Sequence, residues 1–444
     1  MNTQHKMKVL KFGGTSVGSA ERMHALVQLV VNDEAKIVVL SAMSGTTNAL
    51  VEIANALYAK NTAQATTLIN TLEEKYKNEL KRLYITETAL QKGNNLVKFH
   101  FDYLRSFTLD MFTANEEKAI LAQGELLSTA MFHYYLEEMN VSSVLLPALN
   151  FMRIDENDEP DLKSIETHLN EELEKYPGQK LFITQGYICR NAFGEIDNLK
   201  RGGSDYTASL IGAAIYAPEV QIWTDIDGMH NNDPRIVDKT HPIHELSFDE
   251  AAELAYFGAK ILHPTCILPA QKRKIPVLLL NTMQPSAKGT TISEKTTENG
   301  IKAVAAKDGI TAINIKSDRM LLAHGFLRSV FDIFERYKTP IDMITTSEVA
   351  VSLTIDSSKY LKEIVKELEE FSDVTVDENQ SIICIVGDFG SETKGCALKV
   401  LNALKEIPIR MISYGGSPNN VSLLIKGSLK KDALVALNKG LFNY

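Results

Sequence analysis

A lysine followed by glycine and hydroxyl residues forms the first segment of the chain that is suited to chemistry. This segment, KFGGTSVG, covers residues 11–18, after an apolar run at 7–12 that predicts a short strand and before the helical pattern of 19–31. Glycine lets the backbone approach a polyphosphate closely, and the amides at a helix N-terminus attract anions. Lys11 would add a mobile positive charge for a transferring phosphate. A tight structural turn is the alternative, and the segment fits neither the Walker A pattern nor G-x-G-x-x-G.

Other segments repeat this order of strand, small residues and helix. SAMSGTTN at 41–48 follows an apolar run, and RGGSD at 201–205 brings an arginine whose planar fork suits a carboxylate or a phosphate. Glu125, in QGE, is expected at the head of an amphipathic helix, where the dipole favours the ionised carboxylate; an ordinary helix-terminal charge is the alternative. Polar loops follow at WTDIDG (223–228), DPR (233–235) and GAKILHP (258–264).

Length and composition set the broad class of the protein. The 444 residues exceed the ~250–300 at which one hydrophobic core stops growing, so at least two domains are expected. A net charge of -9 argues against broad binding to nucleic acid or anionic membranes, but a small anionic ligand needs only local positive charge. No apolar run reaches the ~18 residues of a membrane span, and no signal peptide is visible. The four cysteines lack CxxC spacing, which indicates reduced thiols in a cytoplasmic protein and excludes a cysteine-rich zinc module.

The elements that must position these segments form two regions. Strand-like and helix-like runs alternate over 7–300, which predicts an α/β fold with βαβ units and a mostly parallel sheet between helices. The turn-rich stretch 284–300 marks a domain boundary. Beyond it, 310–377 has the ferredoxin-like order β-α-β-β-α-β, and a second such module at 381–439 lacks a strand that 301–307 could supply. The first module would then be inserted into the second, with the two docked side by side.

In this order, KFGGTSVG, SAMSGTTN, QGELLST, RGGSDYTA, WTDIDG with DPR, and GAKILHP resemble the motifs of aspartate kinases in the amino-acid kinase superfamily. The resemblance covers nearly the whole chain and implies a catalytic domain at 1–290, a first ACT module at 310–379 and a second made of 300–308 with 380–444. It implies transfer of the γ-phosphoryl group of ATP to the side-chain carboxylate of L-aspartate, giving 4-phospho-L-aspartate on the route to lysine, threonine and methionine. The sequence holds no cluster of metal-ligand residues, so Mg²⁺ is expected to arrive with ATP.

The resemblance also implies roles for individual residues. Lys11, with the amides of Gly13 and Gly14, would stabilise the transferring phosphoryl group, and Asp205 would hold Lys11 in place. Glu125 would bind the α-ammonium of aspartate and Arg201 its α-carboxylate, and the other expected substrate contacts are Ser41, Thr47, Gly202, Gly203 and Ser204. The expected nucleotide contacts are Lys11, Thr224, Asp225, Arg235, Lys260 and Ile261, together with His230, which stands where the family often has an aromatic residue.

The ACT modules imply feedback inhibition by an amino acid and a homodimer formed through the modules. The expected effector contacts resemble those of lysine-sensitive members and are Met320, Gly325, Phe326, Leu327, Pro340, Asp342 and Ser347. Pro340 replaces a small hydroxyl residue, so threonine is the alternative effector, and a purely structural role for the modules is another. Two other functions stay open: a kinase for a glutamate derivative, and a non-catalytic amino-acid sensor. Intact Lys11, Arg201 and Asp205 argue against the sensor.

Overall fold

The computed structural model describes residues 7–109, 112–199, 202–258, 262–296, 300–317, 325–390 and 394–443. The chain forms two compact units, one of Met1–Met229 with Leu262–Lys295 and one of His230–Ile261 with Thr296–Tyr444. The segment 230–261, which the sequence analysis placed in a catalytic domain at 1–290, is therefore grouped with the C-terminal part of the chain. The three domain ranges given above stay a prediction.

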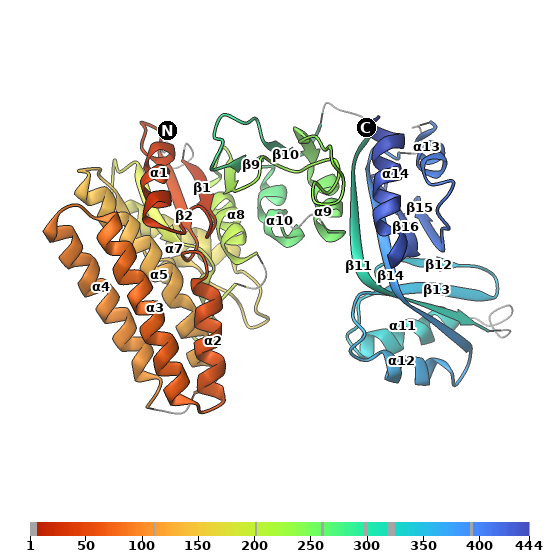
Figure 1. The fold of residues 1–444 in the computed structure, drawn as a ribbon, viewed down its shortest axis with the longest axis horizontal. Helices are drawn as coiled ribbons and strands as arrows, with labels where there is room; N and C mark the ends of the chain where they lie inside the picture. Colours follow the sequence, from red (N-terminus) through yellow and green to blue (C-terminus); the bar gives the residue numbers. More distant parts are fainter. Residues whose placement is uncertain are drawn as a thin grey trace. The chain divides into compact units, whose positions relative to one another are not determined.

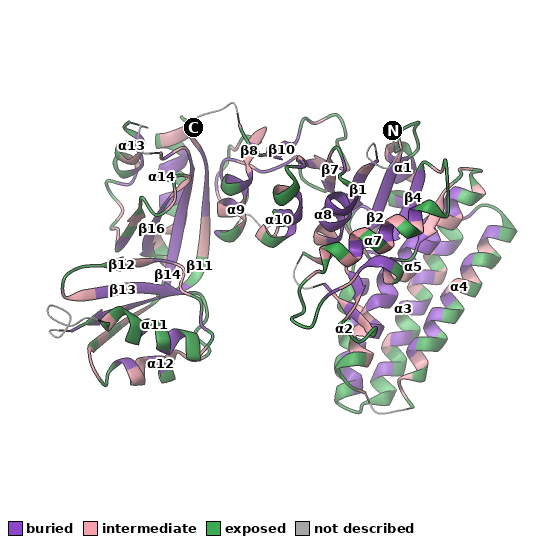
Figure 2. Ribbon diagram, turned by 180° about the vertical axis from the view of Figure 1, so that it is seen from behind, coloured by how far each residue is buried: buried purple, intermediate pink, exposed green. Residues whose placement is uncertain are grey.

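A mostly parallel sheet forms the centre of the first unit (Figure 1). The strands lie in the order β3-β4-β2-β1-β7-β9-β10, and each pair is parallel except β9 with β10. Every residue of β2 and β4 is buried, as expected for inner strands covered on both faces (Figure 2). Their bounds are β1 Lys8–Phe12, β2 Lys36–Leu40, β3 Val144–Leu146, β4 Leu181–Gln185, β7 Val220–Thr224, β9 Val277–Asn281 and β10 Thr290–Ser293.

Helices connect these strands, and local sequence signals fix where several of them begin. Ser19 caps the helix after β1 by accepting a hydrogen bond from the Arg22 amide, and Thr113 and Glu116 form a capping box at the start of α5. Helix α2 and the three long helices α3 to α5 lie side by side (Figure 1). The helices are α1 Ala20–Val30, α2 Thr46–Tyr58, α3 Thr62–Leu83, α4 Glu87–Ser106, α5 Ala114–Glu138, α6 Ala148–Phe151, α7 Leu162–Glu174, α8 Gly203–Ile215 and α10 Pro264–Arg273, with a hairpin of β5 Ile188–Arg190 and β6 Ile196–Asn198.

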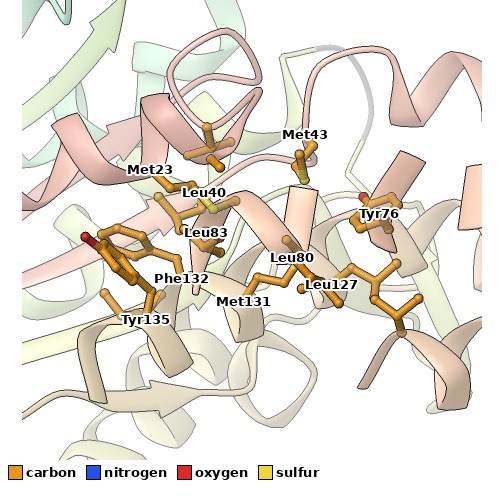
Figure 3. Packing of buried hydrophobic residues seen from close by; sticks show 14 of the residues in the cluster. Met23, Leu40, Met43, Tyr76, Leu80, Leu83, Leu127, Met131, Phe132 and Tyr135 are labelled. Atoms are coloured by element: carbon orange, nitrogen blue, oxygen red, sulfur yellow. The ribbon is translucent and has the colours of Figure 1, made fainter. Parts of the chain in front are cut away.

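Apolar side chains from the sheet and these long helices form one continuous core in the first unit. Figure 3 shows Met23 of α1, Leu40 of β2 and Leu127 of α5 within this cluster. Tyr76 is fully buried there, and its hydroxyl is hydrogen-bonded to Thr46 Oγ1 at 3.1 Å, which satisfies the polar end of the ring. The core therefore holds the first turn of α2 firmly, and that turn borders the candidate site described below.

The second unit contains one antiparallel sheet in the order β12-β13-β11-β14-β16-β15. Two separate apolar clusters cover it, one for each half of the sheet. Figure 1 shows α11 and α12 packed near one half and α13 and α14 near the other. The elements are β8 Glu245–Ser247, α9 Phe248–Tyr256, β11 Ile301–Lys316, α11 Phe326–Arg336, β12 Ile344–Thr346, β13 Ala350–Ile355, α12 Leu361–Leu368, β14 Asp373–Gly387, α13 Cys396–Ala403, β15 Met411–Tyr414, β16 Asn420–Lys426, a 3₁₀ turn Gly427–Leu429 and α14 Lys430–Phe442.

Two long strands run through both halves of this sheet. The sequence had predicted two shorter strands in place of each of them. The expected strands 301–307 and 310–316 are one strand, β11, and 373–377 and 381–387 are likewise one strand, β14. Asp308 and Gly309 stand between the two expected strands, and the backbone absorbs them as a register shift between Lys307 and Ile310, with Gly309 at φ +75°. The two βαββαβ modules predicted from the sequence are confirmed, and they lie side by side in one continuous sheet.

Candidate active site

Loops at the carboxyl ends of parallel strands form the candidate site in the first unit. Strands β1, β2 and β7 are parallel neighbours, so the segments that follow them meet at one edge of the sheet. Two backbone hydrogen bonds hold these segments together: the Gly13 amide donates to Trp223 O at 3.4 Å, and the Ser41 amide donates to Phe12 O at 3.2 Å. Positions far apart in the sequence are thereby fixed next to the end of β1.

An ion pair joins β1 to the beginning of α8. Lys11 Nζ lies 2.7 Å from Asp205 Oδ1, and the two side chains are 10% and 16% exposed. Water screens such a pair only partly, so the carboxylate fixes the position of the ammonium group. A Cβ atom at Gly13 would lie 3.5 Å from Lys11 Nζ, so the glycine leaves the space beside the ammonium open.

A cavity of about 430 Å³ opens beside these loops. Two of its walls are helix N-termini, those of α2 and α8, which begin after Gly45 at φ +77° and Gly202 at φ +74°. Left-handed backbone at both turns favours glycine, and the free amides of both helices attract negative charge. The lining residues are Gly14, Thr15, Ser41, Ala42, Met43, Ser44, Gly45, Thr47, Asn48, Glu125, Tyr187, Gly203 and Ser204.

Glu125 lies in the cavity wall, but in a different setting from the one predicted. It stands in the middle of the long helix α5 rather than at the head of a helix, so no N-terminal dipole favours its ionised form. Burial instead raises its pKa to about 7, although a hydrogen bond from the Ala42 amide to Oε1 (3.1 Å) and the charge of Lys11 oppose this shift. Oε2 is buried and has no hydrogen-bond partner among the residues that the structure describes. A ligand N–H group would satisfy it.

Tyr187 is a lining residue that the sequence analysis did not single out. It follows the buried strand β4, and its backbone is left-handed at φ +68°, where the Thr207 hydroxyl accepts from its amide at 2.9 Å. A Cβ atom at Gly203 would lie 2.4 Å from the Tyr187 ring, and one at Gly186 would lie 2.4 Å from Ser204 Oγ. Glycines at these positions allow β4 and α8 to pack closely. Tyr187 could have been predicted as a site residue from the sequence, because it follows the end of a parallel strand.

The residues expected to bind the nucleotide are divided between the two units. Thr224 and Asp225 follow β7 in the first unit, where Thr224 Oγ1 accepts from the Ile226 amide at 3.2 Å. His230 and Arg235 belong to the second unit. There, His230 Nδ1 is hydrogen-bonded to Thr240 Oγ1 at 2.7 Å, and Asp233 accepts two hydrogen bonds from the Arg235 guanidinium, at 2.9 and 2.7 Å. Four predicted site residues lie outside the described residues: Arg201, Lys260, Ile261 and Met320.

The other expected effector contacts lie in the half of the second unit that contains α11, β12 and β13. Gly325 begins α11 at φ +96°, followed by Phe326 and by Leu327, which is exposed. Pro340 is exposed, and Ser347 Oγ accepts from the Ala350 amide at 3.1 Å. Asp342 differs from these residues, because its side chain is 1% exposed and bonded to Lys307 and Tyr256.

Three further observations concern metals, membranes and thiols. Among the described residues, no group of three or more His, Cys, Asp or Glu side chains could hold a metal ion. Within the same ranges, no helix has the length and apolar character needed to cross a membrane. All four cysteines are buried free thiols.

Comparison with known proteins gives consistent matches. The amino acid kinase family model matches residues 6–281, and an ACT domain model matches residues 383–441. The lysine-sensitive aspartokinase 3 of Escherichia coli is 33% identical over 98% of this chain and 99% of its own length, and the chloroplastic aspartokinase 3 of Arabidopsis thaliana is 33% identical over 98% and 81%. The crystal structure of E. coli aspartokinase III with aspartate and ADP, 33% identical, superposes with a TM-score of 0.84 over 98% of this chain and 100% of that one. The same enzyme with lysine and aspartate gives 0.79.

Proposed function

Because the chain belongs to the amino acid kinase family and within it to the aspartokinases, we propose that it phosphorylates the side-chain carboxylate of L-aspartate with ATP, giving 4-phospho-L-aspartate. The observation that carries this proposal is the Lys11–Asp205 ion pair of 2.7 Å, beside a cavity bordered by two helix N-termini. Aspartate and ADP are the ligands of the related E. coli enzyme in its crystal structure.

The chemistry requires positioning and charge neutralisation rather than proton removal. The carboxylate of free aspartate, with a pKa of about 3.9, is already ionised at neutral pH, so no general base has to create the nucleophile. Two anions must approach each other, and fixed positive charge lowers the cost of that approach. Lys11 supplies this charge at the transferring phosphoryl group, the amides of Gly13 and Gly14 donate hydrogen bonds to it, and Asp205 keeps the lysine in position.

The amino-acid substrate occupies the cavity and is held at both ends. Ionised Glu125 binds the α-ammonium, whose N–H groups satisfy the buried oxygen Oε2. Arg201 binds the α-carboxylate through its two parallel donors. The remaining contacts are the hydroxyls and backbone groups of Ser41, Thr47, Gly202, Gly203 and Ser204.

For the nucleotide, the residues that the family resemblance indicated remain the proposed contacts. We assign Thr224, Asp225, His230 and Ile261 to its neutral parts and Lys260 and Arg235 to its phosphates. Arg235 must leave part of its bidentate contact with Asp233 to do so. Mg²⁺ enters with the ATP phosphates, since magnesium usually keeps several waters and few protein ligands.

The ACT modules give the enzyme feedback control by an end-product amino acid. Lysine is the first candidate because a relative that is 33% identical is lysine-sensitive. Threonine is the second. The enzyme would act at the start of the route to lysine, threonine and methionine, as a homodimer joined through its ACT modules.

An assay of ADP release tests the proposal. We expect ATP turnover that depends on L-aspartate, with formation of a product that hydroxylamine traps as an acyl hydroxamate. Turnover on a glutamate derivative but not on aspartate would identify a different amino-acid kinase. Binding of amino acids without any turnover would identify a sensor.

A further inference from the structure

The segment 41–48, which forms much of the cavity wall, is held near both of its ends by other helices. At its beginning, the Ser41 carbonyl accepts a hydrogen bond from Ser128 Oγ of α5 at 2.8 Å. Where α2 begins, Thr46 Oγ1 is hydrogen-bonded at 3.1 Å to the hydroxyl of Tyr76, a buried residue of α3 (Figure 3). The turn between these two contacts is held by a third side chain.

Lys75 of α3 is this third side chain. Its Nζ donates a hydrogen bond to the Ser44 carbonyl at 2.5 Å. A Cβ atom at Gly45 would lie 3.6 Å from the same Nζ, so the ammonium group lies against the turn that begins α2. The C=O and N–H groups of a trans peptide point in opposite directions, so a Ser44 carbonyl turned toward Lys75 directs the Gly45 amide away from α3. Lys75 thereby fixes the orientation of a peptide in the cavity wall.

No neighbouring carboxylate neutralises the positive charge of Lys75. Within the described ranges, no carboxylate oxygen lies within 4 Å of its Nζ, whereas Lys77 on the same helix pairs with Glu73 at 2.9 Å. Arg82, near the end of this helix, pairs with Glu79 at 3.1 Å. A bond to a carbonyl leaves the charge of the ammonium group in place, so it adds to the attraction that the N-terminus of α2 exerts on anions.

We propose that Lys75 is a positioning residue for the amino-acid substrate, because its hydrogen bond to Ser44 holds the turn at Gly45 and its charge favours an anionic occupant of the cavity. This inference rests on the proposed function, which takes the cavity to be the aspartate site. Lys75 is not a lining residue, so it acts through the turn and through its field. Glycine permits many backbone conformations, and the turn therefore needs an external contact to keep the first amides of α2 directed at a substrate carboxylate.

Lys75→Met tests this role, and Lys81→Met is the matched control, because it removes the same charge from an exposed position of the same helix. We expect Lys75→Met to raise the aspartate KM about tenfold or more, the usual effect of losing a hydrogen bond from a charged group, with little change in kcat or in the KM for ATP. Lys75→Arg should restore most of the loss, since a guanidinium keeps the charge and the donors. The kcat/KM for aspartate should also depend less on salt in Lys75→Met than in the wild type.

Three results of these assays would overturn the proposal. The first is a wild-type aspartate KM in Lys75→Met, whether or not the variant is less stable, because the contact would then be structural only. The second is an equal rise of KM in Lys81→Met, which would show a general effect of net charge. The third is an unchanged salt dependence in Lys75→Met, which would contradict the part assigned to the charge.

A further measurement needs no substrate. The Thr46 amide donates to Met43 O at 3.0 Å across the same turn, so its hydrogen exchange reports on the turn. We expect faster exchange of this amide in Lys75→Met and unchanged exchange in Lys81→Met. Equal exchange in both variants and the wild type would overturn the positioning role whatever the substrate is. A wild-type enzyme that does not turn over aspartate would instead overturn the proposed function, and the Thr46 amide would still decide whether Lys75 holds the turn.

Discussion

Lys11 Nζ lies 2.7 Å from Asp205 Oδ1, which places the ammonium group of the central strand β1 against the first turn of α8. The pair is only partly exposed, and Gly13 keeps a side chain out of the space beside the ammonium group, since its Cβ atom would lie 3.5 Å from Lys11 Nζ. An aspartate in the first turn of a helix also lies where the helix dipole favours negative charge. The lysine is thus held in one position before any substrate arrives.

Lys11→Met is expected to lower kcat by about 10²–10³-fold, the usual effect of removing one preorganised donor from a developing charge. Asp205→Asn should have a smaller effect, because the ammonium group remains but is less firmly held. Steady-state ADP release measures both changes. Lys8→Met is the matched control, since Lys8 lies on the same strand but is not a cavity-lining residue. Its Nζ forms an ion pair of 2.9 Å with Glu34. Near-normal turnover of Lys11→Met would remove this residue from the mechanism.

The pKa of Glu125, about 7, predicts how the enzyme responds to pH. Only the ionised carboxylate binds an ammonium group well, so kcat/KM for aspartate should rise as the pH increases through 7 and then level off. Glu125→Gln should remove this step and raise the aspartate KM at least tenfold. Initial rates between pH 5.5 and 9 test this. Glu137→Gln, at an exposed position of the same helix, should keep the wild-type profile.

The raised pKa of Glu125 makes the folded protein less stable at high pH, although high pH favours substrate binding. Folding raises the pKa of Glu125 from its ordinary value of 4.5 to about 7, so the folded state binds the proton more tightly and loses relative stability as the pH rises from about 5 to 7. At pH 8, Glu125→Gln should therefore be more stable than the wild type, by at most about 3 kcal/mol. Thermal unfolding at pH 5 and pH 8 checks this. A variant that is less stable at both pH values would contradict burial of an ionised carboxylate.

Gly203→Ala should disturb the substrate site by steric contact alone. Its Cβ atom would approach the Tyr187 ring to 2.4 Å, and Tyr187 lines the cavity. Overpacking of this kind costs about 1–3 kcal/mol, so we expect the aspartate KM to rise about tenfold or more. Gly416→Ala is the control, because nothing lies within 4 Å of its Cβ position. An unchanged KM for Gly203→Ala would show that Tyr187 can move without cost to the substrate.

The sequence predicted the fold class well because both kinds of domain have strong local patterns. Buried strands such as Lys36–Leu40, and glycines after strands, identify a parallel sheet with loops at one edge. The helical pattern at 116–138 did predict a helix that contains Glu125, but the glycine of QGE was read as the start of a helix, whereas α5 passes through it without a break. Local patterns could not predict that β11 continues through Asp308 and Gly309, because pairing with β13 and β14 outweighs the local turn preference.

Contacts between side chains that are distant in the sequence could not be predicted from the sequence either. Tyr256 and Asp342 are 86 residues apart, and Glu250 and Lys302 are 52 residues apart. Nothing in the spacing of these residues indicates that they meet. Their contacts follow from the packing of α9 on β11, which places the segment 230–261 with the second unit.

The Glu250–Lys302 pair provides a stability test for the attachment of α9. Both side chains are almost fully buried, and Lys302 Nζ also donates to Thr296 Oγ1 at 2.8 Å. Removal of one partner leaves an uncompensated buried charge, so Lys302→Met should destabilise the second unit by about 3–5 kcal/mol. Adding Glu250→Gln to this variant should restore much of the loss, because the double variant buries no charge. Urea unfolding, monitored by hydrogen exchange of the β11 amides, measures both effects. Lys274→Met is the control, because it breaks an exposed ion pair with Glu294. Equal stability of Lys302→Met and the wild type would show that α9 is held by its apolar contacts alone.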